Sequence, residues 1–435
     1  MAQRLPLHSI QARPRNRFLA AEGAAIVCVC IVTLVMLCSK GSAKQFAELT
    51  SIEGIGAGAV GAPDIRVAVL KDVQSIRIST GASEARILGQ NGIELRRLPA
   101  NSNFQFSTGP AGLILPGGQI VNDANITVES LALDQRLRLN EQEMAPRLIV
   151  HRPPPSRMPV SAGMTVIARL NLEAYLEGVL AGEVPVDRWR PEALKAQAIA
   201  SRSYAYYELK KNVAEPYDVE CTVMSQMFCP GGRCNPAAGT ALLATQGLVL
   251  TINNALFPAY FHSTCGGHTE AGLSVFPDQP AARAVGAAVC AYCAQSPYYR
   301  WQAALNKDAL EQKLKAAYPS IGKLLGVEFY DATGSAIEAA SGNPRRAASV
   351  RVRHTAGVLQ LPGNQFRLLA GPRELKSLLF EQVTDRGRML EISGGGFGHG
   401  VGLCQFGSQG LAQAGRTYPE ILGLYYPGAS LKKMY

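Results

Sequence analysis

Residues 176–205, LEGVLAGEVPVDRWRPEALKAQAIASRSYA, hold the end of one predicted helix and most of a second. Apolar residues recur at helical spacing from Leu172 onward, and Pro185 ends this first helix because proline interrupts the backbone hydrogen bonds. Pro191 suits the first turn of a second helix over residues 191–211, whose many Ala and Ser residues allow close packing. The stretch therefore predicts two neighbouring helices at the centre of the fold.

Glu183 stands out among the carboxylates of the first helix. It lies eleven residues after Leu172 and so falls on the same apolar stripe, whereas Glu173 and Glu177 point to another face. Apolar neighbours and the negative end of the helix both disfavour an ionised carboxylate, so we expect a raised pKa for Glu183. A general acid at neutral pH needs such a pKa. The alternative is a helix-end glutamate that reaches water or an arginine.

Short apolar or alternating runs precede the helices and are punctuated by Gly, Pro and Asn, which is typical of strands. The runs are IRVAVL at 65–70, SIRIST at 75–80, GLILP at 112–116 and RLIVHR at 147–152. They predict a small β-rich region over residues 64–160. A mixed helix and strand core follows over 161–435, with a hairpin at Asn253-Asn254 and a last short helix in YPEILGLYYPG. Strands, then helices, then a mixture favour an α+β fold over a regularly alternating sheet.

The N-terminal residues predict a membrane segment. Residues 1–17 form a basic head, residues 18–39 are almost entirely apolar, and residues 40–63 are a linker rich in Gly and Ala. The positive-inside rule places the head in the cytoplasm and everything after the apolar segment outside it. The segment is either a retained transmembrane anchor or a signal peptide cleaved near Gly41-Ser42-Ala43. We therefore expect an extracytoplasmic protein that is either membrane-anchored or secreted.

The net charge of +10 at pH 7 narrows the class of partner. Four of the positive charges belong to Arg4, Arg13, Arg15 and Arg17 of the head, which leaves the remainder modestly basic. The sequence has no clustered Lys and Arg runs of the nucleic-acid-binding kind, so we expect no nucleic-acid partner. The modest positive charge of the remaining residues is compatible with an anionic polymer as a partner.

The cysteines offer either a metal site or disulfides. Three of the ten cysteines lie in the apolar segment, which leaves seven outside the cytoplasm, where disulfides are the first expectation. A C-x-x-H pair and a C-x-x-C pair with ordinary zinc-ligand spacing are also present. The residues available to a zinc ion are His262, Cys265, His268, Cys290 and Cys293. Among the others, the stretch from Cys221 to Cys234 favours a disulfide, and Cys404 is interpreted as a buried thiol.

Two further groups of polar residues indicate a binding role. Lys195 and Arg202 lie seven residues apart on one face of the second helix. Such charges ordinarily keep their heads in water, but a buried arginine must meet a carboxylate or an anionic ligand. The stretch FGHGVGLCQFGSQGLA, residues 397–412, carries His399 and Gln405 among five glycines. So much glycine favours turns with positive φ or close approach of the backbone to something bound.

These motifs, in this order, resemble the stage II sporulation protein D (SpoIID) family. The similarity runs from about Asp64 to Tyr435 and rests on 176–205, on ATQGLVL at 244–250, on AYFHSTCGGHTE at 259–270 and on residues 394–428. It implies a cell-wall protein that lies outside the membrane. It also implies that Glu183 is the catalytic glutamate of the family's E-V-P motif and that Arg202 is the arginine of its A-R-T-Y-A motif. His262 and Cys265 fall on family positions that line the same cleft and that hold zinc in some members.

The resemblance implies a lytic transglycosylase that acts on the glycan strands of peptidoglycan. A hydrolytic glycosidase needs two carboxylates around the scissile bond. A lytic transglycosylase needs one, because the C6 hydroxyl of the sugar is the nucleophile, so Glu183 would act first as acid and then as base to give 1,6-anhydro ends. This chemistry requires no cofactor, and a zinc ion would be structural. The residues expected to bind the glycan beside a glycine-rich wall are Lys195, Arg202, His399 and Gln405.

The terminal motif departs from the family's usual G-H-G-V-G-M-S-Q-Y-G-A at Leu403, Cys404, Phe406 and Ser408. The missing tyrosine hydroxyl at position 406 is expected to weaken a sugar contact. The wider family also includes proteins described as enhancers of cell-wall amidases. A second hypothesis is therefore a non-catalytic, glycan-binding protein that stimulates an amidase partner.

Overall fold

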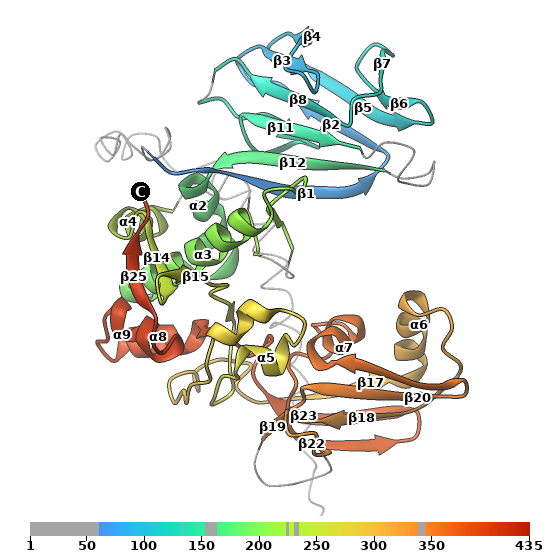
Figure 1. Ribbon diagram of the computed structural model, residues 1–435, viewed down its shortest axis with the longest axis vertical. Coiled ribbons are helices and arrows are strands. Elements are labelled where there is room, and N and C mark those ends of the chain that lie inside the picture. Colours follow the sequence, from blue (N-terminus) through green and yellow to red (C-terminus); the bar gives the residue numbers. More distant parts are fainter. Residues whose placement is uncertain (1–60, 133, 153–162, 223–225, 230–234, 338–343) are drawn as a thin grey trace, which may run out of the picture. The chain divides into compact units, whose positions relative to one another are not determined.

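The computed structural model describes residues 61–132, 134–152, 163–222, 226–229, 235–337 and 344–435 (Figure 1). The predicted basic head, the apolar segment 18–39 and all but the last residues of the linker lie outside this part of the chain. Among the described residues, no helix is long and apolar enough to cross a membrane.

Two sheets form the first part of the fold. A seven-stranded sheet has the order β13-β1-β12-β11-β8-β3-β4, and a six-stranded sheet has the order β10-β9-β2-β5-β6-β7. Neighbouring strands are antiparallel except β1 and β13, which are parallel. The strands are β1 (Asp64–Val73), β2 (Ser75–Ser79), β3 (Ala85–Leu88), β4 (Glu94–Leu98), β5 (Asn103–Gly109), β6 (Gly112–Ile114), β7 (Ile120–Val121), β8 (Asn125–Ser130), β9 (Arg138–Leu139), β10 (Gln142–Glu143), β11 (Arg147–His151), β12 (Met164–Asn171) and β13 (Val219–Glu220).

The β-rich character predicted for this region is confirmed. Each of the four predicted runs contains a strand, namely β1, β2, β6 and β11. The sheet also extends past residue 160, because β12 pairs with both β1 and β11. The strands alternate in burial, so that residues such as Ile65 and Val67 lie in one core, whereas their neighbours along the strand are more exposed.

Two long helices follow the sheet directly, with the bounds that the sequence predicts. They are α2 (Leu172–Glu183) and α3 (Pro191–Lys211). Asn171, the last residue of β12, caps α2 by accepting a hydrogen bond from the N–H of Glu173 at 3.0 Å. Both helices contact β1 (Figure 1). The end of the sheet therefore determines where α2 begins, and Pro185 lies just after its end.

A hairpin follows the helix α4 (Pro236–Ala244). It joins β14 (Leu248–Ile252) to β15 (Ala255–Leu256) through Asn253 and Asn254, both of which have positive φ. A pair of asparagines in this conformation is typical of a two-residue turn whose twist matches that of its strands. The predicted hairpin is confirmed.

Residues 301–395, which the sequence analysis does not divide into elements, form two antiparallel sheets and two helices. Their hydrophobic cluster is distinct from that of the β-rich region. One sheet has the order β17-β23-β22-β19 and the other has the order β18-β20-β21. The elements are β17 (Trp301–Asn306), α6 (Lys307–Ala317), β18 (Leu324–Tyr330), β19 (Arg345–Arg346), β20 (Ser349–His354), β21 (Gly357–Pro362), α7 (Gly363–Ala370), β22 (Leu379–Arg386) and β23 (Met389–Gly395).

The remaining elements surround a further hydrophobic cluster, to which α3 also contributes. They are β16 (Phe261–His262), α5 (Gly272–Val275), a 3₁₀ helix (Pro280–Ala284), β24 (Leu403–Cys404), α8 (Gln405–Gln413), α9 (Tyr418–Tyr425) and β25 (Ser430–Lys433). The strands β16 and β24 pair in parallel, and α9 is the predicted last short helix. The whole is a mixed fold of helices and mainly antiparallel sheets, in line with the α+β prediction.

Two glycines of α2 allow a loop to lie directly against the helix. A Cβ atom at Gly178 would lie 2.6 Å from the backbone oxygen of Cys229, and one at Gly182 would lie 2.9 Å from the backbone oxygen of Met227. The N–H of Cys229 also donates to the backbone oxygen of Gly178 at 3.0 Å. Residues 226–229 are therefore held against the last turns of α2.

We predict that Gly178→Ala destabilises the protein. The added methyl group would overlap Cys229, and overpacking costs about 1–3 kcal/mol, which exceeds the gain of about 1 kcal/mol in helix propensity. Gly423 in α9 is the matched control, because nothing lies within 4 Å of its Cβ position. Gly423→Ala should be neutral or stabilising. Urea unfolding of the two variants measures the difference, and equal stability would contradict the close contact.

Candidate active site

Glu183 is the last residue of α2, and its carboxyl receives two hydrogen bonds. Oε1 accepts from the backbone N–H of Met227 at 2.7 Å, and Oε2 accepts from the side-chain amide of Gln405 at 3.1 Å. Gln405 is the first residue of α8, so this contact joins positions 222 residues apart. The structure thus brings together two residues selected from the sequence. Sequence analysis missed Met227, which has no recognisable pattern because it contributes only a backbone N–H.

Burial raises the pKa of Glu183 from 4.5 to about 7, while the hydrogen bonds from Met227 and Gln405 act in the opposite direction. The residue as a whole is half-buried, but its carboxyl group is enclosed by protein, and loss of water disfavours the charged form. The predicted rise in pKa is confirmed, with burial as its leading cause. At neutral pH both protonation states are populated, which suits a group that first gives and then takes a proton.

Three contacts hold α8 in place, one with the segment after β16 and two with the loop between α2 and α3. The N–H of Phe406 donates to the backbone oxygen of Ser263 at 3.0 Å. The ring of Phe406 packs edge-on against Trp189, with ring centroids 5.7 Å apart. The N–H of Arg190 donates to the side chain of Gln409 at 2.9 Å. The loop between α2 and α3 is therefore fastened to α8, and Gln405 lies at a fixed place.

Arg202 is a structural residue in this fold. Its side chain is fully buried, and Nε and Nη2 each donate to one carboxylate oxygen of Glu173 at 2.8 Å. Nη1 donates to the backbone oxygen of Leu248 at 3.2 Å, and Glu173 also accepts from the hydroxyl of Tyr435 at 2.6 Å. The prediction that Arg202 binds substrate is corrected, because a neighbouring helix supplies its anion. Glu173 lies on another face of α2 than Glu183, as predicted, and that face is also buried.

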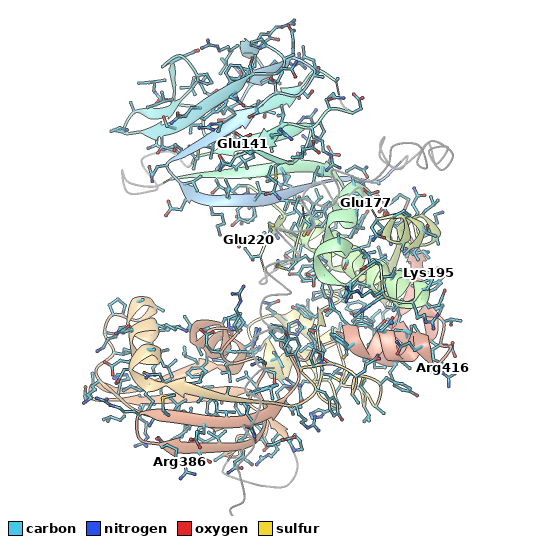
Figure 2. The ribbon with its side chains drawn as sticks, turned by 180° about the vertical axis from the view of Figure 1, so that it is seen from behind. Glu141, Glu177, Lys195, Glu220, Arg386 and Arg416 are labelled. Atoms are coloured by element: carbon cyan, nitrogen blue, oxygen red, sulfur yellow. The ribbon has the colours of Figure 1, made fainter. Side chains whose placement is uncertain are left out.

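Lys195 lies on α3 and has partners at the start of α9 (Figure 2). Its Nζ donates to Glu192 at 2.7 Å and lies 5.8 Å from the centre of the Tyr418 ring. Glu192 in turn accepts from the N–H of Tyr418 at 2.8 Å. The described contacts link Lys195 to α9 rather than to Glu183, so a role in substrate binding stays a prediction.

His399 and His262 are neighbouring, neutral histidines. Their ring centroids lie 5.4 Å apart. Burial is the main cause that lowers the pKa of His262 to about 3 and that of His399 well below its usual value. Nδ1 of His399 accepts from the N–H of Val401 at 3.1 Å, which leaves its Nε2 as the protonated nitrogen. His399 also contacts the rings of Tyr260 and Phe276 and hydrogen-bonds the backbone of Phe261, and its role in substrate binding stays a prediction.

The glycines beside His399 serve the packing of the protein itself. Gly398, Gly400 and Gly402 have φ angles of 110°, 84° and 69°, which favour glycine. Added Cβ atoms would meet His262, Arg346 and Tyr260, in that order. Protein atoms occupy the space that these Cβ atoms would take, and the glycine-rich wall for a glycan stays a prediction.

Four cysteines form a cluster that the sequence analysis predicts only in part. The sulfur atoms of Cys265, Cys290, Cys293 and Cys404 all lie within 4.8 Å of one another, and all four residues are buried. Cys404, which the sequence predicts to be a buried thiol, is indeed buried, but it belongs to this cluster. Seven cysteines follow the apolar segment, and three of them lie between positions 221 and 234. The four that remain are the members of the cluster, so this count could have identified the cluster from the sequence.

The two predicted histidine ligands lie outside this cluster. His262 donates through Nδ1 to the backbone oxygen of Val401 at 3.1 Å, and Nε2 of His268 faces Glu270 at 3.1 Å. Of the five predicted ligands, the cluster therefore contains Cys265, Cys290 and Cys293 but neither histidine. The structure has no disulfide between Cys221 and Cys229, and Cys234, the third cysteine of that stretch, lies outside the described residues.

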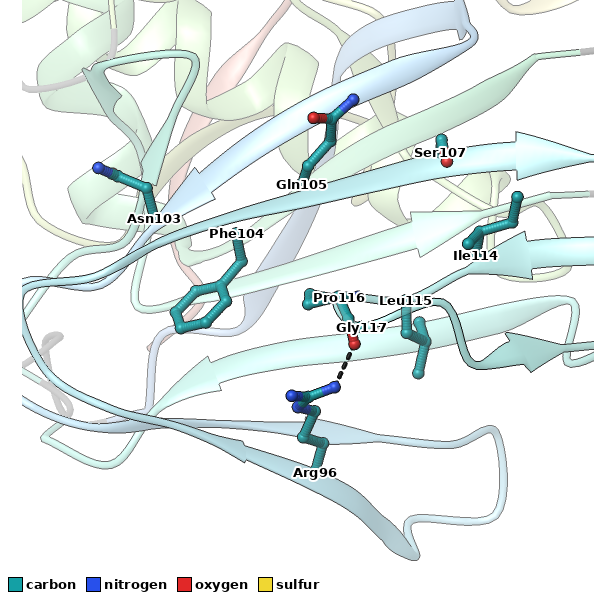
Figure 3. A pocket seen from close by; sticks show the side chains of 9 residues that line it. All are labelled: Arg96, Asn103, Phe104, Gln105, Ser107, Ile114, Leu115, Pro116 and Gly117. Atoms are coloured by element: carbon teal, nitrogen blue, oxygen red, sulfur yellow. Dashed lines mark hydrogen bonds between the residues drawn. The ribbon is translucent and has the colours of Figure 1, made fainter.

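Two surface pockets lie in the β-rich region rather than at Glu183. The larger, of about 500 Å³, is lined by residues that include Arg96, Phe104 and Ile114, and Arg96 donates a hydrogen bond to the backbone of Pro116 (Figure 3). The second, of about 400 Å³, is lined in part by Asp134 and Arg136. Neither includes Glu183 or Gln405, so the candidate site rests on side-chain chemistry and not on pocket size.

We predict that Arg202→Met acts on stability. Removing one partner of a buried ion pair leaves Glu173 as an uncompensated charge, which costs about 3–5 kcal/mol. Lys195→Met is the control on the same helix, because its pair with Glu192 is partly exposed and is worth at most about 1 kcal/mol. Denaturant unfolding measures the free energy lost in each of the two variants. A stable Arg202→Met protein that has lost only ligand binding would contradict the structural role.

We also predict that the difference in unfolding free energy between Glu183→Gln and the wild type depends on pH. The folded-state pKa of Glu183, about 7, lies above the value of 4.5 expected in the unfolded chain. The free energy of unfolding of the wild type therefore falls as pH rises from about 4.5 to 7, by up to about 3 kcal/mol, because the buried carboxyl becomes charged. Glutamine stays neutral at every pH. The stability of the variant relative to the wild type should therefore increase between pH 5 and pH 8, as measured by urea unfolding. A difference in unfolding free energy that does not change with pH would contradict the raised pKa of Glu183.

Comparison with known proteins agrees with this geometry. The family model described as Stage II sporulation protein matches residues 160–252, which include α2 and α3, and a Domain of unknown function (DUF8618) matches residues 291–402. The chain is 33% identical over 278 residues to an uncharacterized protein of Brachyspira hyodysenteriae, a match that covers 63% of this chain and 70% of the relative.

Two relatives from Bacillus subtilis have descriptive names. The Amidase enhancer is 28% identical over 295 residues, which cover 59% of this chain and 40% of that protein. Stage II sporulation protein D is 27% identical over 286 residues, which cover 61% of this chain and 76% of that protein. With Glu183 and Gln405 brought together as described, the chain belongs to the stage II sporulation protein D (SpoIID) family.

Proposed function

We propose that this protein is a lytic transglycosylase that cleaves the glycan strands of peptidoglycan. The observation that carries the proposal is the Glu183 carboxyl, which has a pKa of about 7 and two hydrogen-bond donors at the end of α2. Membership of the SpoIID family supports a role at the cell wall. Glycan strands lie outside the membrane, so the protein would act there, either tethered or released.

Glu183 performs both proton transfers in this mechanism. In its protonated form it gives the proton to the glycosidic oxygen while the bond from that oxygen to C1 of the sugar breaks. The resulting carboxylate then takes the proton of the C6 hydroxyl of the same sugar, whose oxygen bonds to C1 and closes the 1,6-anhydro ring. Glu183 ends protonated, as it began. A pKa near the working pH allows both steps.

The partners of Glu183 orient its carboxyl for this route. The described groups that hydrogen-bond Glu183 are the Met227 N–H and the Gln405 amide, which are both donors. Gln405 holds the carboxylate in place after the first proton transfer, and it cannot itself act as a base.

The test is mass spectrometry of the soluble products released from purified glycan strands, with and without peptide stems. We expect anhydro-ended fragments from the wild type and a loss of at least a hundredfold in Glu183→Gln, which cannot give up a proton. Glu141→Gln is the control, because Glu141 is an exposed residue of the β-rich region (Figure 2) and should retain full activity. Fragments with reducing ends would mean hydrolysis and would contradict the one-carboxylate mechanism.

The second candidate function is stimulation of a cell-wall amidase. The relative named Amidase enhancer favours it, over 59% of this chain. In that case the protein binds glycan strands and leaves them intact, and Glu183→Gln retains full stimulation of an added amidase. Cleavage by the wild type but not by the variant would decide for the enzyme.

A further inference from the structure

The four clustered cysteines come from three separate segments of the chain. Cys265 follows β16, Cys290 and Cys293 lie on one turn, and Cys404 ends β24 immediately before α8. Their sulfur atoms lie within 4.8 Å of one another, and those of Cys265 and Cys293 are 3.4 Å apart. Such convergence of four buried thiols on one point requires an explanation beyond ordinary packing.

A single tetrahedral ion fits this spacing. Zinc binds four thiolates at about 2.3 Å, which places the sulfur atoms about 3.8 Å apart. A separation of about 3.8 Å lies within the 4.8 Å limit that all four sulfur atoms meet, and Cys265 and Cys293 are slightly closer than that. An iron–sulfur cluster is a larger group, and its cysteine ligands must lie further apart than around one ion. Four protein ligands leave no open position, which is typical of a structural site rather than a catalytic one.

The surroundings of the sulfur atoms are those of charged thiolates. The N–H groups of Cys265 and Gly407 donate to the sulfur of Cys404 at 3.2 and 3.3 Å, and the N–H of Gly267 donates to that of Cys265 at 3.5 Å. The hydroxyl of Tyr425 lies 3.1 Å from the sulfur of Cys290. Outer hydrogen bonds of this kind orient metal ligands and stabilise their charge.

A buried arginine lies beside the cluster. Four thiolates around one Zn²⁺ carry a net charge of about −2, which a buried site must offset. The side chain of Arg346 is 3% exposed, and its Nη2 donates to the backbone oxygen of Cys265 at 3.0 Å. Its Nε has no hydrogen-bond partner and lies 3.7 Å from Glu270. Arg346 thus places a buried positive charge between the cluster and Glu270.

We propose that Cys265, Cys290, Cys293 and Cys404 hold one zinc ion, and that this ion fixes the start of α8. Cys404 is the N-cap of α8, and the next residue is Gln405, which hydrogen-bonds Glu183. Cys404 also accepts from the N–H of Gly407 within the first turn of the helix. Gln405 is therefore a residue positioned by the metal site, whatever reaction Glu183 performs.

Metal content and X-ray absorption of the full-length protein test the ligand set. We expect one zinc per chain with four sulfur ligands at about 2.3 Å. Cys404→Ser should lose at least 90% of the zinc, whereas Cys221→Ser, the control outside the cluster, and His262→Ala should retain it. X-ray absorption that shows nitrogen ligands on the zinc would overturn the assignment. So would zinc that is lost in His262→Ala but retained in Cys404→Ser.

A second measurement on the wild type alone separates metal from disulfides. We expect all described cysteines to be reactive thiols after zinc removal under denaturing, non-reducing conditions. A metal-free protein whose intact mass is lower by two hydrogens for each disulfide bond among these four cysteines would overturn the proposal.

Hydrogen exchange tests whether the ion fixes the start of α8. The amides of residues 403–410 should exchange at least tenfold faster after the zinc is removed by a chelator, and unchanged exchange would overturn this positioning role. Neither readout depends on glycan cleavage.

Discussion

The buried ion pair between Arg202 and Glu173 holds the centre of this fold together. It joins α3 to α2, while Arg202 also bonds the backbone of β14 and Glu173 also bonds the hydroxyl of Tyr435, the last residue. A buried charge that loses its partner is costly, so the two helices cannot separate without a large penalty. Because α2 carries Glu183 at its end, about 15 Å further along the helix axis, this interior contact determines the direction in which the candidate acid points.

Two opposing influences act on Glu183, and their balance gives the site its chemistry. Burial raises the pKa of the carboxyl, while donors from the 226–229 loop and from α8 lower it and keep the group in one orientation. The loop approaches because α2 has glycine where it passes, and α8 approaches because Phe406 and Gln409 bind the segment after α2. The proposed zinc centre adds a further constraint on the same helix start, through Cys404. A single carboxyl can then serve in turn as acid and base.

Local patterns in the sequence were sufficient for the parts of the structure that depend on near neighbours. The bounds of α2 and α3, the Asn253-Asn254 turn and the inward stripe that ends at Glu183 all follow from spacing and from proline or asparagine chemistry. Long-range contacts were less accessible. A buried arginine needs an anion, but the sequence does not say whether it is Glu173 or a ligand. Zinc-ligand spacing identified short-range pairs and therefore selected His268 rather than the distant Cys404.

The central claim is that Glu183 carries a proton at neutral pH in a substantial fraction of molecules. The most direct measurement is a carbon-13 NMR titration of the protein labelled at its glutamate carboxyls, with the Glu183→Gln variant to assign the signal. The account predicts that the signal absent from the variant titrates at about 7. A Glu183 signal that titrates near 4.5, the ordinary value, would contradict it.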